Sequence, residues 1–259
     1  MDATEVFSGI ERQNEILQWI IRQRRVSVNS ICERFSVSEA TARRDLELLA
    51  SQGKIQRVHG GAIALQQAPP EEPILQRQDE QLRYKQRIGA LAAGFVQDGE
   101  TIFLGSGSTV LEVARNLHER RSLTVITNSL PVINTLAGVQ GLTLVCLGGI
   151  LRSSELSFIG HITEQALAEV HADKVFIGVR AISLEQGLTN DYLPETMTDR
   201  AILKAGREVI VVADHTKFGR VSTAFLAALE SIHIIVTDEQ APSDFISAVS
   251  ARNIRLIQA

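Results

Sequence analysis

The sequence predicts an α/β protein built of two unequal parts. Its 259 residues suffice for two domains with separate cores. The stretch QQAPPEEP at 66–73 holds three of the six prolines and lacks apolar periodicity, which is typical of an extended linker. Short β-branched apolar runs alternate with helical patterns after it, so the second part is predicted to have a mostly parallel sheet with both faces covered. We expect domains at 1–65 and 77–259, joined by a linker at 66–76.

The first part has the pattern of three helices followed by a hairpin. Apolar residues recur at helical spacing in 11–23, 29–35 and 39–52, and 26–28 is a short extended piece. Ser38 is the expected N-cap of the third helix, and Gly53 is its expected left-handed stop. The alternating segment 54–65 contains a Gly-Gly turn. This order of elements predicts a winged helix-turn-helix.

The second part supplies the strands of the expected sheet. They are predicted at 101–105, 123–127, 142–148, 173–178, 208–214 and 232–237. Apolar residues make up 44% of the chain and charged residues 22%, as in ordinary globular proteins. The net charge of −4 argues against a protein that coats nucleic acid generally, although a global sum can hide a local site.

The cysteines, the N-terminal residues and the histidines indicate the cellular compartment and the metal content. Cys32 and Cys146 lie in apolar runs, so we expect buried thiols in a reducing compartment. The N-terminal residues lack the features of a secretion signal and no apolar run is long enough to span a membrane, so a cytoplasmic protein is expected. The six histidines have no metal-ligand spacing, and we expect neither metal nor cofactor.

The third predicted helix carries the candidate DNA contacts. Its apolar face leaves Thr41, Arg43 and Arg44 outside, where a major-groove helix meets phosphates and base edges. In the hairpin, Arg57 and His59 are placed to contact the DNA backbone that flanks the recognition helix. The alternative is a solvated face in which the two arginines pair with neighbouring acids.

The run VSVNSICERFSVSEATARRDLELLASQGKIQRVHGGA, at 26–62, resembles the N-terminal signature of the DeoR family of bacterial sugar-metabolism regulators. The resemblance implies a sequence-specific domain that binds double-stranded operator DNA. It implies Ser38, Thr41, Arg43 and Arg44 as contacts of the recognition helix, and His59 as a contact of the wing.

The rest of the chain also resembles that family, whose C-terminal half is similar in fold to ribose-5-phosphate isomerase. Matching pieces include LGSGST (104–109), VITNSL (125–130), LGG (147–149) with Arg152, and VADHTKFG (212–219). Loops at the carboxyl ends of parallel strands meet around one pocket, and a helix N-terminus attracts anions. Candidate effector-binding residues are Ser106, Gly107, Ser108, Thr109, Thr127, Asn128, Ser129, Gly149, Arg152, Asp214 and Lys217.

Two positions depart from the pattern of the family. Gly105 stands where the family commonly has Asp, and Asp199 stands near a position that is Lys in many members. The departures point to a changed effector pocket. Isolated glycines in such a loop are more often steric necessities than ligand contacts, and DHTK at 214–217 also fits a local cap.

The resemblance implies a repressor of carbohydrate-metabolism genes that acts as a homo-oligomer, a dimer or tetramer. A phosphorylated sugar would be its effector and would weaken operator binding. The alternative is an enzyme, a sugar-phosphate isomerase or amino-sugar deaminase with an accessory DNA-binding domain. Asp191, two residues after Thr189, keeps an acid where such isomerases have one.

Overall fold

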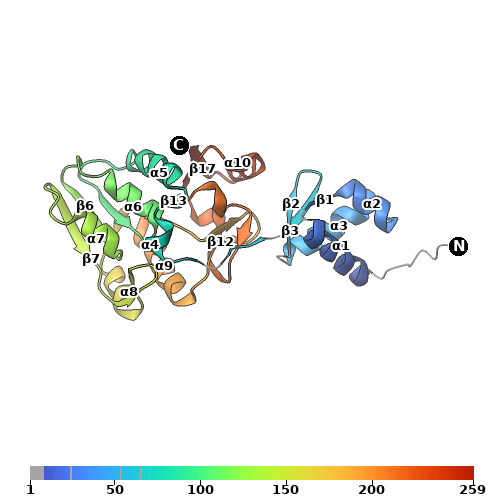
Figure 1. Ribbon diagram of the computed structural model, residues 1–259, viewed down its shortest axis with the longest axis horizontal. Helices are drawn as coiled ribbons and strands as arrows, with labels where there is room; N and C mark the ends of the chain where they lie inside the picture. Colours follow the sequence, from blue (N-terminus) through green and yellow to red (C-terminus); the bar gives the residue numbers. More distant parts are fainter. Residues whose placement is uncertain (1–8, 24, 53, 65, 70) are drawn as a thin grey trace.

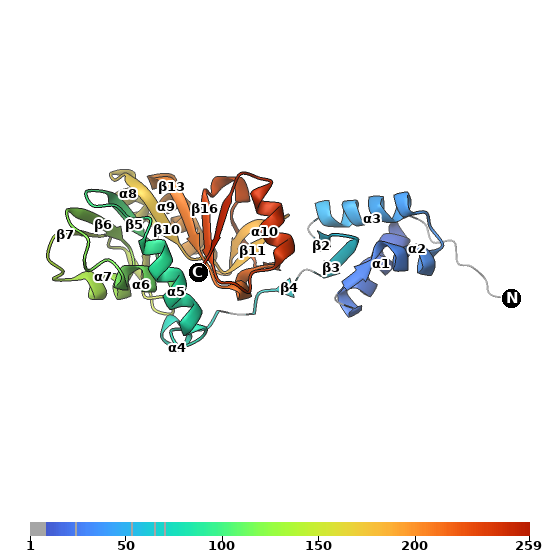
Figure 2. The same ribbon diagram turned by 90° about the horizontal axis from the view of Figure 1, so that it is seen from above.

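Two parts are distinct in the structure. A computed structural model describes residues 9–23, 25–52, 54–64, 66–69 and 71–259. The N-terminal part lies to one side of a larger α/β body, and the segment around residue 68 joins them (Figures 1 and 2). Gly53, the expected stop of the third helix, lies outside the described residues.

The N-terminal part is a winged helix, as the sequence predicts. Its elements are α1 (Gly9–Gln23), β1 (Arg25–Ser27), α2 (Val28–Phe35), α3 (Glu39–Ser51), β2 (Ile55–Val58) and β3 (Gly61–Ala64). The three strands form an antiparallel sheet in the order β1-β3-β2. Apolar side chains of the helices and the wing, including Ile16, Ile31 and Leu46, form its core.

Side-chain caps set where the helices of this domain begin. Helix α2 starts at Val28, one residue earlier than predicted, because Ser27 and Ser30 form a reciprocal capping box. Ser38 caps α3 as predicted, since its side chain accepts a hydrogen bond from the N–H of Thr41.

The segment between the domains is only partly extended. Its first residues form β4 (Gln66–Gln67), which pairs in parallel with β14 (Arg220–Val221) of the body. The short helix α4 (Ile74–Arg77) follows, and the Ile74 side chain is fully buried. The Ile74 N–H donates to the Ser154 carbonyl at 2.8 Å, so the end of the predicted linker is anchored on the body.

The body contains a seven-stranded sheet in the order β17-β16-β13-β10-β5-β6-β7, in which every pairing is parallel. Its strands are β5 (Thr101–Leu104), β6 (Leu123–Thr127), β7 (Leu142–Cys146), β10 (Ala172–Ile177), β13 (Gly206–Val212), β16 (Ile234–Thr237) and β17 (Arg255–Gln258). Six of them are the predicted strands, and β17 is the addition.

Helices cover both faces of this sheet. They are α5 (Leu82–Ala93), α6 (Ser108–Arg115), α7 (Leu130–Leu136), α8 (His161–Ala168), α9 (Leu193–Ala205) and α10 (Ser243–Ser250). The first three pack on one face, with Ile102 and Leu104 of β5, and the other three pack on the face that carries Phe103. This alternation is the period of two expected of a strand that is buried on both sides.

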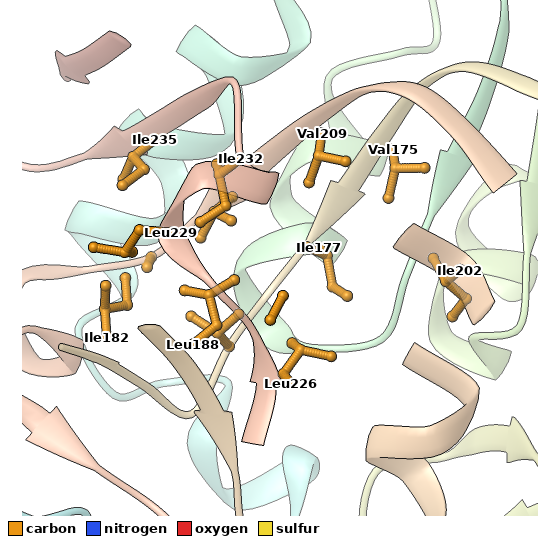
Figure 3. Close-up of a cluster of buried hydrophobic side chains, with 14 of the residues drawn as sticks. Val175, Ile177, Ile182, Leu188, Ile202, Val209, Leu226, Leu229, Ile232 and Ile235 are labelled. Atoms are coloured by element: carbon orange, nitrogen blue, oxygen red, sulfur yellow. The ribbon is translucent and has the colours of Figure 1, made fainter. Parts of the chain in front are cut away.

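A small antiparallel sheet joins the second face. It is formed by β11 (Ala181–Ser183), β12 (Gly187–Asn190) and β15 (Ala224–Ala227). Ile182, Leu188 and Leu226 from these strands pack near Ile177 and Val209 of the main sheet (Figure 3). A hairpin of β8 (Ile150–Arg152) and β9 (Ser157–Ile159) and two single-turn helices, η1 (His215–Lys217) and η2 (Leu229–Ser231), complete the body.

Gly89 allows α5 and α6 to pack at close range. A Cβ atom at this position would lie 2.5 Å from the Glu112 Cβ and 2.6 Å from the Glu112 carbonyl carbon. Only glycine fits that spacing without moving α6, the helix that follows the loop 105–107.

The expectation of two buried thiols was wrong for one cysteine. Cys146 is exposed because β7 is an edge strand of the sheet, whereas Cys32 is partly buried. Among the residues that the structure describes, no helix is long and apolar enough to cross a membrane.

Candidate functional site

Helix α3 presents the predicted DNA contacts on its outer side. The Ser38 Oγ lies 2.9 Å from the Thr41 Oγ1, so both side chains sit at the start of the helix. Arg43 and Arg44 are exposed. Arg43 forms an i,i+4 ion pair with Glu39 at 2.5 Å, and Arg44 lines a shallow hollow between α1 and α3.

Asp45 fixes the orientation of α3 against α1. Its buried carboxylate accepts hydrogen bonds from Arg12 Nε at 2.7 Å and from Gln13 Nε2 at 2.9 Å. Asp45, which the sequence suggests as a partner of Arg43 or Arg44, therefore points inward and pairs between α1 and α3. Because Arg12 and Gln13 of α1 both bind Asp45, α3 is held in one orientation against α1, and this fixes the direction of its outer face.

The wing places two further candidates beside this helix. Arg57 on β2 lies 3.4 Å from the Glu47 carboxylate of α3; Glu47 is exposed and Arg57 is partly exposed. His59 lies in the exposed turn between β2 and β3. Arg57 is thus near the recognition helix, while the DNA contacts themselves stay predictions.

A cavity of about 440 Å³ opens at the carboxyl ends of β5, β10 and β13. The strand order reverses here, because β5 lies between β6 on one side and β10 on the other. Such a switch point is where open parallel sheets bind their ligands. Six predicted effector residues line the cavity, namely Ser106, Gly107, Ser108, Thr109, Asp214 and Lys217.

The start of α6 contributes hydroxyl and amide groups to the wall. Gly107 adopts φ = 117°, a backbone conformation that favours glycine, and Ser108 is the first residue of the helix. The first amides of a helix have no acceptor within it, and the helix dipole adds positive potential there. This end of the cavity is suited to an anion.

Cationic side chains line the same cavity, namely Lys85, Arg180, Lys217 and Arg220. Burial lowers the pKa of Lys85 to about 8, against the opposing attraction of Asp214. Burial also lowers the pKa of Lys217. An anion bound beside both amines would favour their charged forms and bind more tightly for that reason.

Acids line the same cavity, and Glu195 accepts a hydrogen bond from the Ser106 hydroxyl at 3.5 Å. The Glu195 carboxylate accepts a hydrogen bond from the Ser157 hydroxyl at 2.5 Å and forms an ion pair with Arg152. Asp199 accepts from Asn190 Nδ2 at 2.9 Å. Arg152, predicted to touch the effector, is not part of the cavity wall and instead holds Glu195 in place. Hydroxyl groups of a ligand would find acceptors at these acids.

Asp214 has a local role as well as a place on the wall. Its side chain caps η1 by accepting from the Thr216 N–H at 2.9 Å, as the local-cap alternative proposed. The neighbouring His215 pairs with Asp238 at 2.9 Å. Capping orients η1, so that Lys217 at its end lines the cavity.

The structure does not bring the predicted residues Thr127, Asn128 and Ser129 to the cavity. Thr127 donates to the Leu104 carbonyl at 2.6 Å and accepts from the Ser129 N–H at 3.0 Å. Asn128 Nδ2 donates to the Phe158 carbonyl at 2.9 Å. These side chains brace the end of β6, which lies on the side of β5 away from β10.

Two glycines near the predicted site also lie off the cavity wall. A Cβ atom on Gly149 would lie 2.1 Å from the Thr163 hydroxyl, so this glycine allows close packing against α8. Gly105, the departure from the family pattern, packs over the end of β10 and donates from its N–H to the Phe176 carbonyl at 2.9 Å. Neither residue lines the cavity.

Several cavity residues were missed by the sequence reasoning. They are Glu71, Arg77, Lys85, Glu155, Arg180 and Glu195. The signal available for the first two was the apolar pair Ile74–Leu75 between them, which is unusual in a solvated linker. Lys85 and Glu195 lie in helices and Glu155 and Arg180 in loops, where charge alone predicts a solvent-facing side chain.

The N-terminal domain is a winged helix whose recognition helix α3 is held to α1 by an ion pair. It is joined to an α/β domain with a polar cavity at the switch point of the sheet. This combination defines a two-domain transcriptional regulator. The DeoR-like helix-turn-helix domain family matches residues 12–68, and the DeoR C-terminal sensor domain family matches residues 80–239. The chain belongs to the DeoR family of transcriptional repressors.

Curated relatives agree with this assignment over nearly the whole chain. The transcriptional repressor AccR of Agrobacterium fabrum is 34% identical, with 88% of this chain and 89% of the relative covered. The glycerol-3-phosphate regulon repressor of Escherichia coli is 33% identical, with 95% and 97% covered. A putative aga operon transcriptional repressor of Escherichia coli is 32% identical, with 95% and 93% covered.

Solved structures resemble the body more distantly. Ribose 5-phosphate isomerase A from Methanocaldococcus jannaschii is 20% identical, with 52% of this chain and 53% of that chain covered and a TM-score of 0.39. At that score the likeness is partial, and it says nothing about activity.

We predict that Asp199 makes the protein less stable as the pH rises. Burial, with the nearby Glu195 adding repulsion, raises the pKa of Asp199 well above its ordinary value of 3.8. Its stabilising contribution is therefore present below pH 3.8 and is lost as the pH rises through the folded-state pKa. Asp199→Asn should flatten the decline, by up to about 1.4 kcal/mol per pH unit.

Thermal unfolding at a series of pH values checks this prediction. The exposed Asp79→Asn variant is the matched control and should leave the slope of Tm against pH unchanged. An Asp199→Asn variant with the wild-type slope would show that Asp199 titrates normally in the folded protein.

Proposed function

We propose that the chain represses carbohydrate-metabolism genes and that a phosphorylated sugar, bound in the body cavity, relieves its binding to operator DNA. The observation that carries this proposal is the meeting of the α6 N-terminus with Lys217 and Arg180 at the switch point of the sheet. A buried anion site next to acceptors for hydroxyl groups suits a sugar phosphate better than an apolar ligand.

The chemistry of the wall gives each part of such a ligand a partner. The phosphate would lie at Ser108, Thr109 and Lys217, and the hydroxyls would donate to Asp191 and Asp199. The cavity volume of about 440 Å³ is within the ordinary range of small-molecule sites. A relative named for the glycerol-3-phosphate regulon supports a phosphorylated effector for this family member.

The proposal includes a homo-oligomer, a dimer or tetramer, that binds two half-sites in double-stranded DNA. Two linked domains bind more tightly because the second contact forms at high effective concentration. Exposed large apolar side chains gather in and around α8, α9 and the β8–β9 hairpin, at Ile150, Leu151, Ile162, Tyr192, Leu193, Met197 and Phe225. Such a patch is typical of an association surface. The protein would act in the cytoplasm.

We predict that sugar phosphates raise the melting temperature of the protein and that Lys217→Met removes this effect. A ligand at a hundred times its Kd adds about 2.7 kcal/mol to the free energy of unfolding. Losing one charged hydrogen bond costs about 1.5–3 kcal/mol, or roughly a tenfold to hundredfold loss of affinity. Lys204→Met, an exposed lysine near the end of α9, is the control.

Thermal shift with pentose and hexose phosphates, followed by operator-release assays on the hits, tests the proposal. Stabilisation by a sugar phosphate with release of DNA and no turnover is the expected result. If no sugar phosphate changes the melting temperature, the phosphorylated effector is wrong. If a hit is turned over, the protein is an enzyme of the alternative class.

A further inference from the structure

The segment between the two domains forms part of the cavity wall. Pro69, Glu71, Glu72 and Arg77 all line the same cavity as the α6 N-terminus and Lys217. The proposed effector site is thus bounded by the chain that leads directly from the wing to the body. A ligand in this site would contact the connection between the domains as well as the body.

The Glu71 carboxylate lies beside two arginines of this wall. Its carboxylate lies 3.0 Å from Arg77 Nη1 and 3.7 Å from Arg180 Nη1. Its N–H donates to Asp191 Oδ2 at 3.2 Å, and the Pro69 carbonyl accepts from Arg180 Nη2.

The residues after Glu71 are anchored much more firmly. Ile74 is fully buried, and Arg77 binds both oxygens of the buried Glu155 carboxylate at 2.5 and 2.6 Å. Lys85 Nζ donates to the Arg77 carbonyl at 2.7 Å. Helix α4 is therefore anchored on the body by buried contacts, while Pro69, Glu71 and Glu72 are held through polar contacts with Arg77, Arg180 and Asp191.

The other end of this stretch is tied to the cavity by β14. The parallel β4–β14 pair joins Gln66 to Arg220, and Arg220 lies on the cavity wall three residues after Lys217. Strand β4 lies between the wing and Glu71 in the chain, so a displacement of β14 would disturb β4 as well. Residues that hold the connection between the domains would therefore also contact the ligand.

We propose that Glu71 is an internal competitor for the anionic group of the effector, and that the effector displaces its carboxylate from Arg180 and releases residues 66–72. The inference rests on the proposed function of the cavity. Two anions cannot both hold one guanidinium in the same geometry, so ligand binding and the closed position of Glu71 oppose each other. By linkage, the closed position weakens ligand binding by the same factor that the ligand weakens closure.

Calorimetric titration of the full chain with inorganic phosphate and with ribose 5-phosphate tests the competition. Glu71→Gln keeps the size of the side chain and removes its charge, so we expect it to bind these probes about tenfold more tightly than wild type. Glu72→Gln is the matched control: Glu72 lines the cavity, but within the described residues its carboxylate forms no ion pair.

Hydrogen exchange of the peptide that covers 66–73 tests the release. Ribose 5-phosphate should speed exchange in wild type, and Glu71→Gln should exchange fast without any probe. If wild type binds the probes but Glu71→Gln has the same affinity and the same exchange, the competitor is wrong and the effector site stands. If neither protein binds a phosphate, both proposals fail.

Discussion

Arg77→Ala is expected to lower the free energy of unfolding of the body by about 3–5 kcal/mol, because it leaves a buried carboxylate without its partner. Arg77 forms a bidentate pair with Glu155, and both side chains are less than 10% exposed. It also pairs with Glu71 and donates from Nε to the Glu72 carbonyl at 2.6 Å. One substitution therefore removes the partner of several groups.

The pH of the measurement changes the size of this effect. Burial raises the pKa of Glu155 to about 7, with Glu71 adding to the rise and Arg77 opposing it. Without Arg77 the pKa of Glu155 rises further, so at pH 5 the carboxyl group is neutral and costs less. The loss of stability in Arg77→Ala should accordingly be larger at pH 8 than at pH 5.

Chemical denaturation measures the free energy of unfolding of Arg77→Ala and of two further variants for comparison. Arg87 pairs with Glu239 at 2.9 Å, but both side chains are about half exposed, so Arg87→Ala should cost about 0–1 kcal/mol. The double change Arg77→Leu with Glu155→Leu should recover much of the stability, since it leaves no unpaired charge at that position. If Arg77→Ala costs no more than Arg87→Ala, α4 is not anchored by this pair.

The fold was predictable from the sequence where its signals are local. A capping serine, helical spacing and a Gly-Gly turn define the winged helix, and Ser38 caps α3 as expected. Six strands of the main sheet are continuous apolar runs that need no knowledge of their neighbours. Strand β17 (RLIQ) and strands β11 (AIS) and β12 (GLTN) of the small sheet were missed because each contains at most two consecutive apolar residues, too few for a recognisable pattern.

The cavity was predictable only in part, because strand order is not written in the sequence. The loops after β5, β10 and β13, three successive parallel strands of the sheet, all line the cavity. Thr127 ends β6, which the strand order places on the far side of β5, and its side chain donates a hydrogen bond to the Leu104 carbonyl instead. Glu71 was assigned to a solvated linker because nothing local shows that the linker folds onto Arg180.

The same limit applies to Arg44 and Asp45, which adjoin in the sequence. The charges of RRD favour mutual pairing, yet Asp45 turns inward to Arg12 of α1. Pairing across 33 residues is a tertiary contact that no short window contains. It leaves the outward arginines with fewer acidic partners than the sequence indicates, which strengthens the case for α3 as a DNA-reading helix.

Arg44→Ala is expected to weaken binding to the operator by about tenfold to a hundredfold, corresponding to about 1–3 kcal/mol for one bidentate base contact. Arg44 is exposed on α3, and the Asp45–Arg12 pair holds this helix in one orientation. Duplexes selected from a random-sequence library with the full-length protein provide the operator. Affinity for the selected duplex and for an unrelated duplex is then measured for both proteins.

The comparison separates the two roles that an exposed arginine can have. If Arg44 reads a base, the selected duplex loses more affinity than the unrelated one, because only the selected duplex offers the correct base edge. If Arg44 contacts phosphate alone, both duplexes lose equally and the salt dependence of log K falls by about one unit of slope. Arg207→Ala removes an equal charge from an exposed site on the body and should change neither affinity. Unchanged operator affinity in Arg44→Ala would remove this residue from the DNA contacts.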